Sequence, residues 1–169
     1  MISVIVINRT FAITFGIGLL VVASLVTFVF HQQRGAHLEW HGSVLKVRTV
    51  ALDETSTLLL VDFRLANSAD YPTVLRTMTL EMQAADGSVT DGVPIAAADV
   101  PRMFSYYKLL GEQFNPVLRD QDRVPAGASL DRMTAFRLPL PFADVERRKG
   151  ITLHLSDSSG RATADLSAH

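Results

Sequence analysis

Residues 59–66 read Leu-Leu-Val-Asp-Phe-Arg-Leu-Ala, and this stretch decides the fold of the chain. Successive side chains of a β-strand point to opposite faces, so an apolar period of two predicts a strand with one face in a core. The residues expected to face that core are Leu59, Val61, Phe63 and Leu65, which alternate with Leu60, Asp62, Arg64 and Ala66. Residues 67–72, Asn-Ser-Ala-Asp-Tyr-Pro, are rich in turn formers and end the strand.

The same period of two recurs along most of the chain after residue 44. Further strands are expected at residues 45–49, 77–82, 88–90, 129–138, 151–155 and 161–166. Asp86-Gly87 predicts a hairpin turn, so the strands from 59–66 to 88–90 are expected to form a meander. Six or seven strands with one or two short helices predict a mainly β protein, an antiparallel sandwich of immunoglobulin or fibronectin type.

The middle of the chain changes to a helical period. Asp99 is expected to cap a helix of about three turns that has Pro101 in its first turn and ends at Gly111. Its apolar face comprises Val100, Met103, Phe104, Tyr107 and Leu110. We expect this face to cover an open end or face of the sheet, with a ligand-binding lid as the alternative. A second, shorter helix is expected at residues 142–149.

Residues 10–30, from Thr10 to Phe30, contain no charged side chain. A helix of this length reaches about 31 Å, enough to cross a hydrocarbon core of about 30 Å. The stretch is longer than the apolar region of a cleaved signal peptide, and no small-x-small cleavage site follows it. We therefore expect a signal anchor organised as a short tail (1–9), a single transmembrane helix (10–30), a juxtamembrane linker (31–38) and a β-sandwich domain (39–169).

Within the expected span, Ala12 and Gly16 place two small residues four positions apart, a spacing that lets another membrane helix approach closely. The cations flanking the span, Arg9 before it and Arg34 after it, do not decide its orientation. A domain of more than a hundred residues is translocated largely regardless of charge. We expect a single-pass protein of the cell membrane whose domain faces the extracytoplasmic side, the periplasm.

The charge and cysteine counts exclude several classes of function. The chain has 16 Lys and Arg against 17 Asp and Glu, which argues against a nucleic-acid partner because phosphate binding rests on concentrated basic charge. It has no cysteine, so thiolate catalysis and cysteine-ligated zinc are excluded. His37, Glu39 and His41 could point three metal ligands from one strand face, but we interpret them as polar surface residues just beyond the membrane. We expect no metal, no cofactor, no catalytic residue and no small-molecule substrate.

Residues 61–72, Val-Asp-Phe-Arg-Leu-Ala-Asn-Ser-Ala-Asp-Tyr-Pro, are followed by an expected strand at 77–82. This order of strand, Asn, small polar residues, Tyr-Pro and strand resembles the late-embryogenesis-abundant type 2 sandwiches, also called water stress and hypersensitive response (WHy) domains. The chain departs from that pattern by placing a helix around residues 104–110. The resemblance implies a non-enzymatic sandwich with no catalytic residues.

Two functions follow as expectations. The first is a non-enzymatic, membrane-anchored accessory or scaffolding subunit, whose partners are the lipid bilayer and other membrane protein subunits. Aromatic side chains are enriched in such contacts, and the expected contact residues are Phe104, Tyr106, Tyr107 and Phe114. The second, implied by the resemblance, is a stress-protection or envelope-maintenance protein that acts without a fixed partner.

Overall fold

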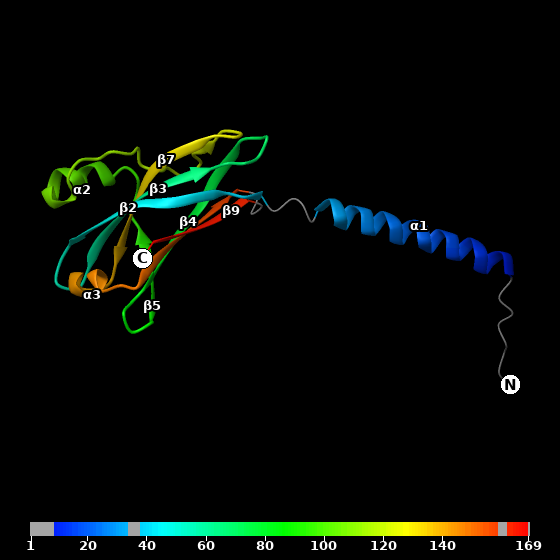
Figure 1. The fold of residues 1–169 in the computed structure, drawn as a ribbon, viewed down its shortest axis with the longest axis horizontal. Coiled ribbons are helices and arrows are strands. Elements are labelled where there is room, and N and C mark those ends of the chain that lie inside the picture. The colour runs from blue at the N-terminus through cyan, green and yellow to red at the C-terminus, as the bar shows by residue number, and fades with distance from the viewer. Residues whose placement is uncertain (1–8, 34–37, 159–161, 169) are drawn as a thin grey trace. The chain divides into compact units, whose positions relative to one another are not determined.

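The computed structural model describes residues 9–33, 38–158 and 162–168, and Figure 1 shows the chain as a ribbon. The chain divides into two compact units, Met1–His37 and Leu38–His169. The first contains one helix, and the second contains all the described strands. The tail and linker residues 1–8 and 34–37 lie outside the described residues.

The helix α1 covers Arg9–Gln33, which is 25 residues and extends past both ends of the expected span. Its described side chains, at residues 13–28, are exposed. Within the part of the chain that the structure describes, no helix is found that has both the length and the apolar character to cross a membrane. The structure therefore supports a helix here, while the transmembrane assignment stays a prediction.

The second unit is mainly β. Its strands are β1 (Leu38–Glu39), β2 (His41–Ala51), β3 (Thr57–Ala66), β4 (Thr73–Gln83), β5 (Val89–Pro94), β6 (Arg123–Val124), β7 (Ser129–Leu138), β8 (Gly150–Asp157) and β9 (Ala162–Ala168). Its helices are α2 (Val100–Tyr106), the 3-10 helix η1 (Lys108–Leu110) and α3 (Phe142–Glu146). The expected mainly β, antiparallel class is confirmed.

Strand order follows the path β1-β9-β8-β4-β5-β7-β3-β2, with β6 beside β4. Within this path only β1 and β9 run parallel. The strand β5 pairs with β4 through residues 89–92 and with β7 through residues 93–94, so it joins the two layers of the sandwich. The expected hairpin at Asp86-Gly87 is confirmed, with the Gly87 amide donating to the Ala84 carbonyl at 3.0 Å and a Gly87 φ of 92°.

The expected meander is wrong. β3 lies between β2 and β7, whereas β4 lies between β8 and β5. The turn after β3 therefore carries the chain from one layer to the other instead of reversing it within a layer. Asn67 organises this turn, since its Nδ2 donates to the carbonyls of Tyr71 at 3.0 Å and Val124 at 3.1 Å.

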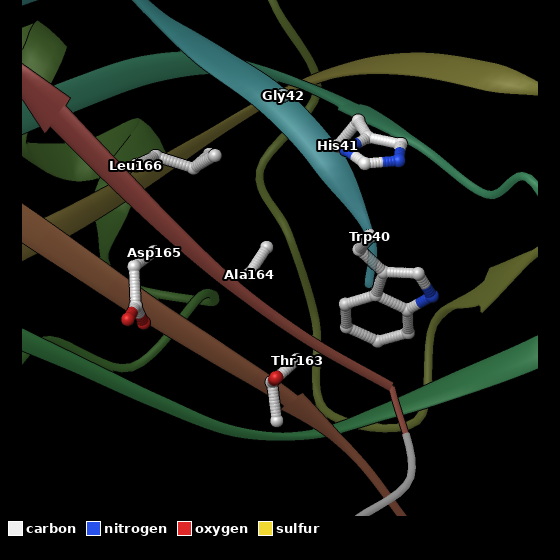
Figure 2. A pocket seen from close by; sticks show the side chains of 7 residues that line it. All are labelled: Trp40, His41, Gly42, Thr163, Ala164, Asp165 and Leu166. Atoms are coloured by element: carbon white, nitrogen blue, oxygen red, sulfur yellow. The ribbon is translucent and has the colours of Figure 1, made fainter. Parts of the chain in front are cut away.

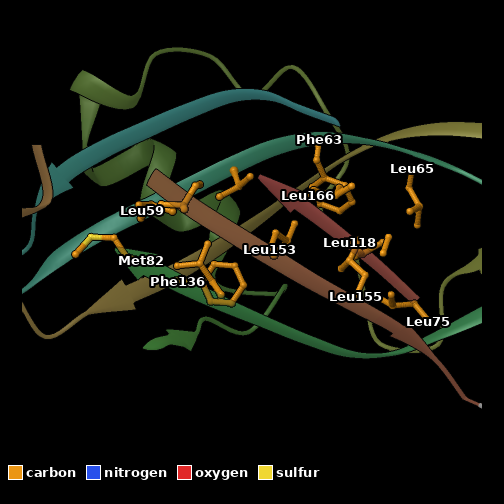
Figure 3. Close-up of a cluster of buried hydrophobic side chains, with 14 of the residues drawn as sticks. Leu59, Phe63, Leu65, Leu75, Met82, Leu118, Phe136, Leu153, Leu155 and Leu166 are labelled. Carbon is orange, nitrogen blue, oxygen red and sulfur yellow. The ribbon is translucent and has the colours of Figure 1, made fainter. Parts of the chain in front are cut away.

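The main core lies between the two layers, and Figure 3 shows part of it. The four residues of β3 predicted to face inward, Leu59, Val61, Phe63 and Leu65, all belong to it. From the other strands it receives Leu80 and Met82 of β4, Phe136 and Leu138 of β7, Ile151, Leu153 and Leu155 of β8, and Ala164 and Leu166 of β9. The period of two thus correctly identified the core face of β3.

The opposite face of β3 is also buried. Leu58 and Leu60 are fully buried in a second cluster with Val50, Met133 and Ala135 of the neighbouring strands. The residues covering them come from α2, η1 and the chain around them: Val100, Met103, Phe104, Tyr107, Leu110 and Val117. Figure 1 shows α2 against this side of the layer. The expectation that the helix covers a face of the sheet is confirmed.

The helix itself differs from the expectation in two details. α2 ends at Tyr106 and continues as the 3-10 turn η1, so the segment is not one helix of three turns. Asp99 makes no capping hydrogen bond, and its carboxylate instead accepts from Arg102 at 3.2 Å. The apolar residues face the sheet despite the change of helix type, because burial of their side chains outweighs ideal helical geometry.

Burial on both faces predicts that Leu60→Ala destabilises the protein about as much as Leu59→Ala. Each substitution should cost about 2–5 kcal/mol, because each removes a fully buried side chain and leaves a cavity. Urea denaturation followed by circular dichroism measures both. A Leu60→Ala protein as stable as wild type would contradict a covered second face.

Candidate interaction surface

An arginine lies buried beneath residues 99–118, which comprise α2, η1 and the chain that follows them. Arg48 of β2 is 8% exposed, and its Nη2 contacts Oδ2 of Asp62 on the adjacent strand β3 at 2.7 Å. Its Nη1 donates to the carbonyl oxygens of Leu110 and Glu112, each at 2.8 Å. One guanidinium therefore joins two strands to the chain that follows α2.

Both charges of this pair have further partners. The second carboxylate oxygen of Asp62 accepts from Nδ2 of Asn115 at 2.8 Å. The Arg48 guanidinium carbon lies 5.1 Å from the ring centre of Phe104 and 6.0 Å from that of Phe114. A buried ion pair repays its desolvation only when good geometry and extra hydrogen bonds satisfy its remaining groups. The pair is well satisfied, although no hydrogen-bond partner of the Arg48 Nε is found among the described residues.

The chain after η1 is also fixed to β7. The Leu118 amide donates to the Met133 carbonyl at 2.8 Å, and the Met133 amide donates to the Pro116 carbonyl at 3.0 Å. Residues 99–118, which we call the α2 segment, are thus held by apolar packing, by the Arg48–Asp62 pair and by backbone hydrogen bonds. The segment is a firmly attached layer of the fold.

This attached layer presents large apolar side chains to solvent. Tyr106 is 84% exposed, Leu109 is 89% exposed and Phe114 is 67% exposed, the three highest values for large apolar side chains in the described part of the second unit. We call these three residues the α2 surface. Large apolar side chains on a rigid support are typical of protein contact sites, because little conformational entropy is lost on binding.

Of the four contact residues expected from the sequence, Tyr106 and Phe114 are exposed, while Phe104 and Tyr107 are half-buried and pack on the second cluster. Sequence reasoning missed Leu109. A signal was present, since a residue next to Leu110 on a helix is rotated by about 100° from it. It also placed Asp62 opposite the core face of its strand, on a side that the α2 segment instead covers.

The other sequence candidates do not converge on a site. The side chains of Thr10, Ala12, Phe30 and Glu39, and all of His37, lie outside the described residues. A Cβ added at Gly16 would meet nothing within 4 Å in the described structure. Among the described residues no group of three His, Cys, Asp or Glu side chains is placed to hold a metal ion.

A histidine flanked by two carboxylates lies on the outer face of the other layer. His154 Nδ1 lies 2.7 Å from Oδ1 of Asp165, and its Nε2 lies 3.6 Å from Oε2 of Glu81. A hydrolytic triad needs a hydroxyl nucleophile on the second ring nitrogen. Here the second ring nitrogen faces the carboxylate of Glu81. We therefore interpret the three residues as a row of charged and polar side chains on neighbouring strands.

Two of the carboxylates whose pKa is lowered belong to turns. Hydrogen bonds from the Ser56 hydroxyl and from the amide and hydroxyl of Thr55 lower the pKa of Asp53 to about 2. The hydroxyl and amide of Ser88 likewise lower the pKa of Asp86. Both carboxylates are thereby kept ionised and engaged in turn hydrogen bonds, which is the opposite of a general acid or base near neutral pH.

Comparison with known proteins identifies no family. No family model matches the chain, and neither does any curated protein. Among solved structures it is similar to a candidate lipoprotein (ycdA) of Bacillus subtilis subsp. subtilis str. 168, with a TM-score of 0.47 and 11% identity over 79% of this chain and 37% of that one. This chain thus spans little more than a third of that protein.

Two further structures resemble it more weakly. A β-glucuronidase from glycoside hydrolase family 2 gives a TM-score of 0.41 and 11% identity over 72% of this chain and 10% of that one. An uncharacterised β-sandwich protein from Clostridium difficile 630 gives a TM-score of 0.35 and 10% identity over 78% of this chain and 81% of that one. These likenesses carry no argument about function.

The geometry predicts that Asp62→Ala costs about 3–5 kcal/mol, because it leaves the Arg48 charge buried and unpaired. Asp131→Ala is the matched control, since it breaks the exposed pair with Arg64 and should change stability only slightly. Urea denaturation of both variants tests the difference. Equal stability of the two would contradict a structural role for the buried pair.

Proposed function

We propose that this chain is a non-enzymatic accessory subunit, anchored in a membrane by α1, whose sandwich binds another membrane protein through the α2 surface. The observation that carries the proposal is the exposure of Tyr106, Leu109 and Phe114 on a segment whose inner side is fixed to the sheet. Exposed apolar side chains that gather in one patch mark sites of protein interaction.

The proposal explains why a polar pair is buried under the α2 segment. The guanidinium of Arg48 binds the carbonyls of Leu110 and Glu112, two residues that lie between Leu109 and Phe114 in the chain. Because this backbone is already fixed in the free protein, less conformational entropy is lost when a partner binds. The pair therefore preorganises the contact residues.

Membrane anchoring is supported by the sequence and by the exposed apolar side chains of α1. No charge occurs from residue 10 to residue 30, and Ile13, Phe15, Leu19, Leu20 and Phe28 are each about 60% exposed or more. Such a helix is stable in water only if something apolar covers it. Lipid is the proposed cover, with the sandwich on the extracytoplasmic side.

A second candidate is stress protection without a fixed partner, supported by the resemblance of residues 61–72 to the WHy sandwiches. We rank it second because the structure gives the residues of that motif a local role. Asn67 is 1% exposed, and its amide organises the turn between the layers. A phenotype confined to drying or osmotic stress would favour this candidate.

Truncating the α2 surface should separate binding from folding. We predict that Leu109→Ser weakens partner binding roughly 30-fold, the effect of losing a contact worth about 2 kcal/mol, without lowering the melting temperature. Val89→Ser, exposed on β5, is the matched control and should bind as wild type. Native mass analysis of mild-detergent extracts measures the stoichiometric complex. A wild-type protein recovered only as a monomer would overturn the proposal.

Anchoring by α1 predicts how the chain behaves when membranes are extracted with carbonate. After carbonate extraction and ultracentrifugation, the full chain should remain with the membrane pellet. Leu20→Arg should shift it toward the supernatant, since a charge near the centre of a span costs about 2.5–3.5 kcal/mol. Val89→Arg adds the same charge to the sandwich and should sediment as wild type. Release of wild-type chain by carbonate would contradict anchoring by α1.

A further inference from the structure

The outer edge of β9 is only partly occupied. One side of β9 pairs with β8 from Thr163 to Ala168. On the other side, the pairs with β1 among the described residues are Leu38 with Ala162 and Glu39 with Thr163. The chain then leaves this edge to pair with β3 as β2. Beyond Thr163, no described strand pairs with the outer side of β9.

One hydrogen bond shows which backbone amides and carbonyls of β9 point away from β8. The Trp40 amide donates to the Thr163 carbonyl at 2.9 Å, so the backbone of Thr163 faces outward. Backbone N–H and C=O groups of alternate residues in a strand point to the same side. The amides and carbonyls of Asp165 and Ser167 therefore also face outward. These four groups form a short template for one more strand.

A hollow lies beside this template. It has a volume of about 350 Å³. It is lined by Trp40, by His41 and Gly42 at the start of β2, and by residues 163–166 of β9. Figure 2 shows β2 and β9 diverging across it, with Ala164 and Leu166 directed toward β2 and Asp165 directed away. The backbone edges separate here, which leaves space beside β9.

Gly42 keeps the wall of this hollow free of a side chain. A Cβ at this position would clash with the backbone oxygen of Arg64 and would approach Cδ2 of Leu166 to 3.0 Å. The first residues of β2 therefore pass close to both β3 and the side chain of Leu166, and they pair with β3 and not with β9 in the described structure. A larger residue would push β2 away from β3.

We propose that this edge binds an extended peptide segment of a partner protein, which adds to β9 as a strand and continues the line that β1 begins. The backbone of the peptide pairs with the outward amides and carbonyls of Asp165 and Ser167. This is strand addition, in which main-chain hydrogen bonds provide affinity and alternate side chains provide selectivity.

Charge and size define the peptide. On the outer face Asp165 is 68% exposed, and it shares His154 with Glu81. Two carboxylates around one imidazole leave net negative charge whether or not the imidazole is protonated, so a basic side chain is favoured there. On the inner face Ala164 and Leu166 favour a small apolar side chain. The expected segment thus alternates apolar and basic residues.

This site is separate from the α2 surface and goes beyond the proposed function. Its probe is a phage-displayed library of random twelve-residue peptides, selected on the full chain in detergent micelles. We expect enrichment of alternating apolar and basic sequences. Synthetic peptides of these sequences should slow hydrogen exchange at the amides of Asp165 and Ser167.

Variants make the test specific to the edge. Ser167→Pro removes one outward amide without removing a hydrogen bond to β8, and it should weaken peptide binding at least tenfold. Ser167→Thr keeps the amide and should bind as wild type. Asp165→Lys reverses the charge and should weaken binding of basic peptides, which keeps the test available if Ser167→Pro fails to fold. Leu109→Ser should bind the peptides normally, so failure of the α2 proposal is distinguishable.

Three outcomes would overturn the proposal. The first is a selection that enriches no sequence. The second is a set of peptides that bind Asp165→Lys as tightly as wild type. The third is protection of the Asp165 and Ser167 amides before any peptide is added, in a sample that sediments as a dimer, because a second copy of the chain would then occupy the edge.

Discussion

The burial of β3 on both faces is the constraint on which the rest of the second unit depends. One face of this strand packs into the space between the two layers, and the other carries Leu58 and Leu60, which are fully buried as well. A sandwich of two layers covers only one face of each sheet. A third layer is therefore required over β2, β3 and β7, and the α2 segment supplies it.

The third layer must also accommodate charge, because Arg48 and Asp62 lie on the face that it covers. Their mutual contact, the two carbonyls that Arg48 binds and the amide of Asn115 satisfy most of the buried polar atoms. This polar contact sets the position of the α2 segment along the sheet, which apolar packing alone would specify less closely. The outward direction of Leu109 and Phe114 follows from that position.

Much of this arrangement could be predicted from the sequence. The period of two in residues 59–66 correctly gave the core face of β3, and the apolar spacing of Val100, Met103, Phe104, Tyr107 and Leu110 correctly gave a covering helix. The covered second face was also signalled, since Leu60 stands among the residues expected to face solvent. One leucine among Asp62 and Arg64 was too weak a signal to override their charge.

Strand order could not be predicted in the same way. A turn such as residues 67–72 looks the same whether it reverses a chain within one layer or carries it to the other. The difference lies in contacts made far along the chain, such as Asn67 with the carbonyl of Val124 and β3 with β7. The Arg48–Asp62 pair was missed for the same reason, because its burial depends on residues about fifty to sixty positions later.

Native-state hydrogen exchange tests the central claim, that the α2 segment is an integral layer of the fold, most directly. The amides of Tyr107 and Leu118 bond to the carbonyls of Met103 and Met133, and both should open with a free energy close to that of the Leu60 amide in β3. This result would mean that the segment and the strand unfold together. Exchange of Tyr107 and Leu118 at a free energy several kcal/mol lower would instead show a loosely attached segment and contradict the account.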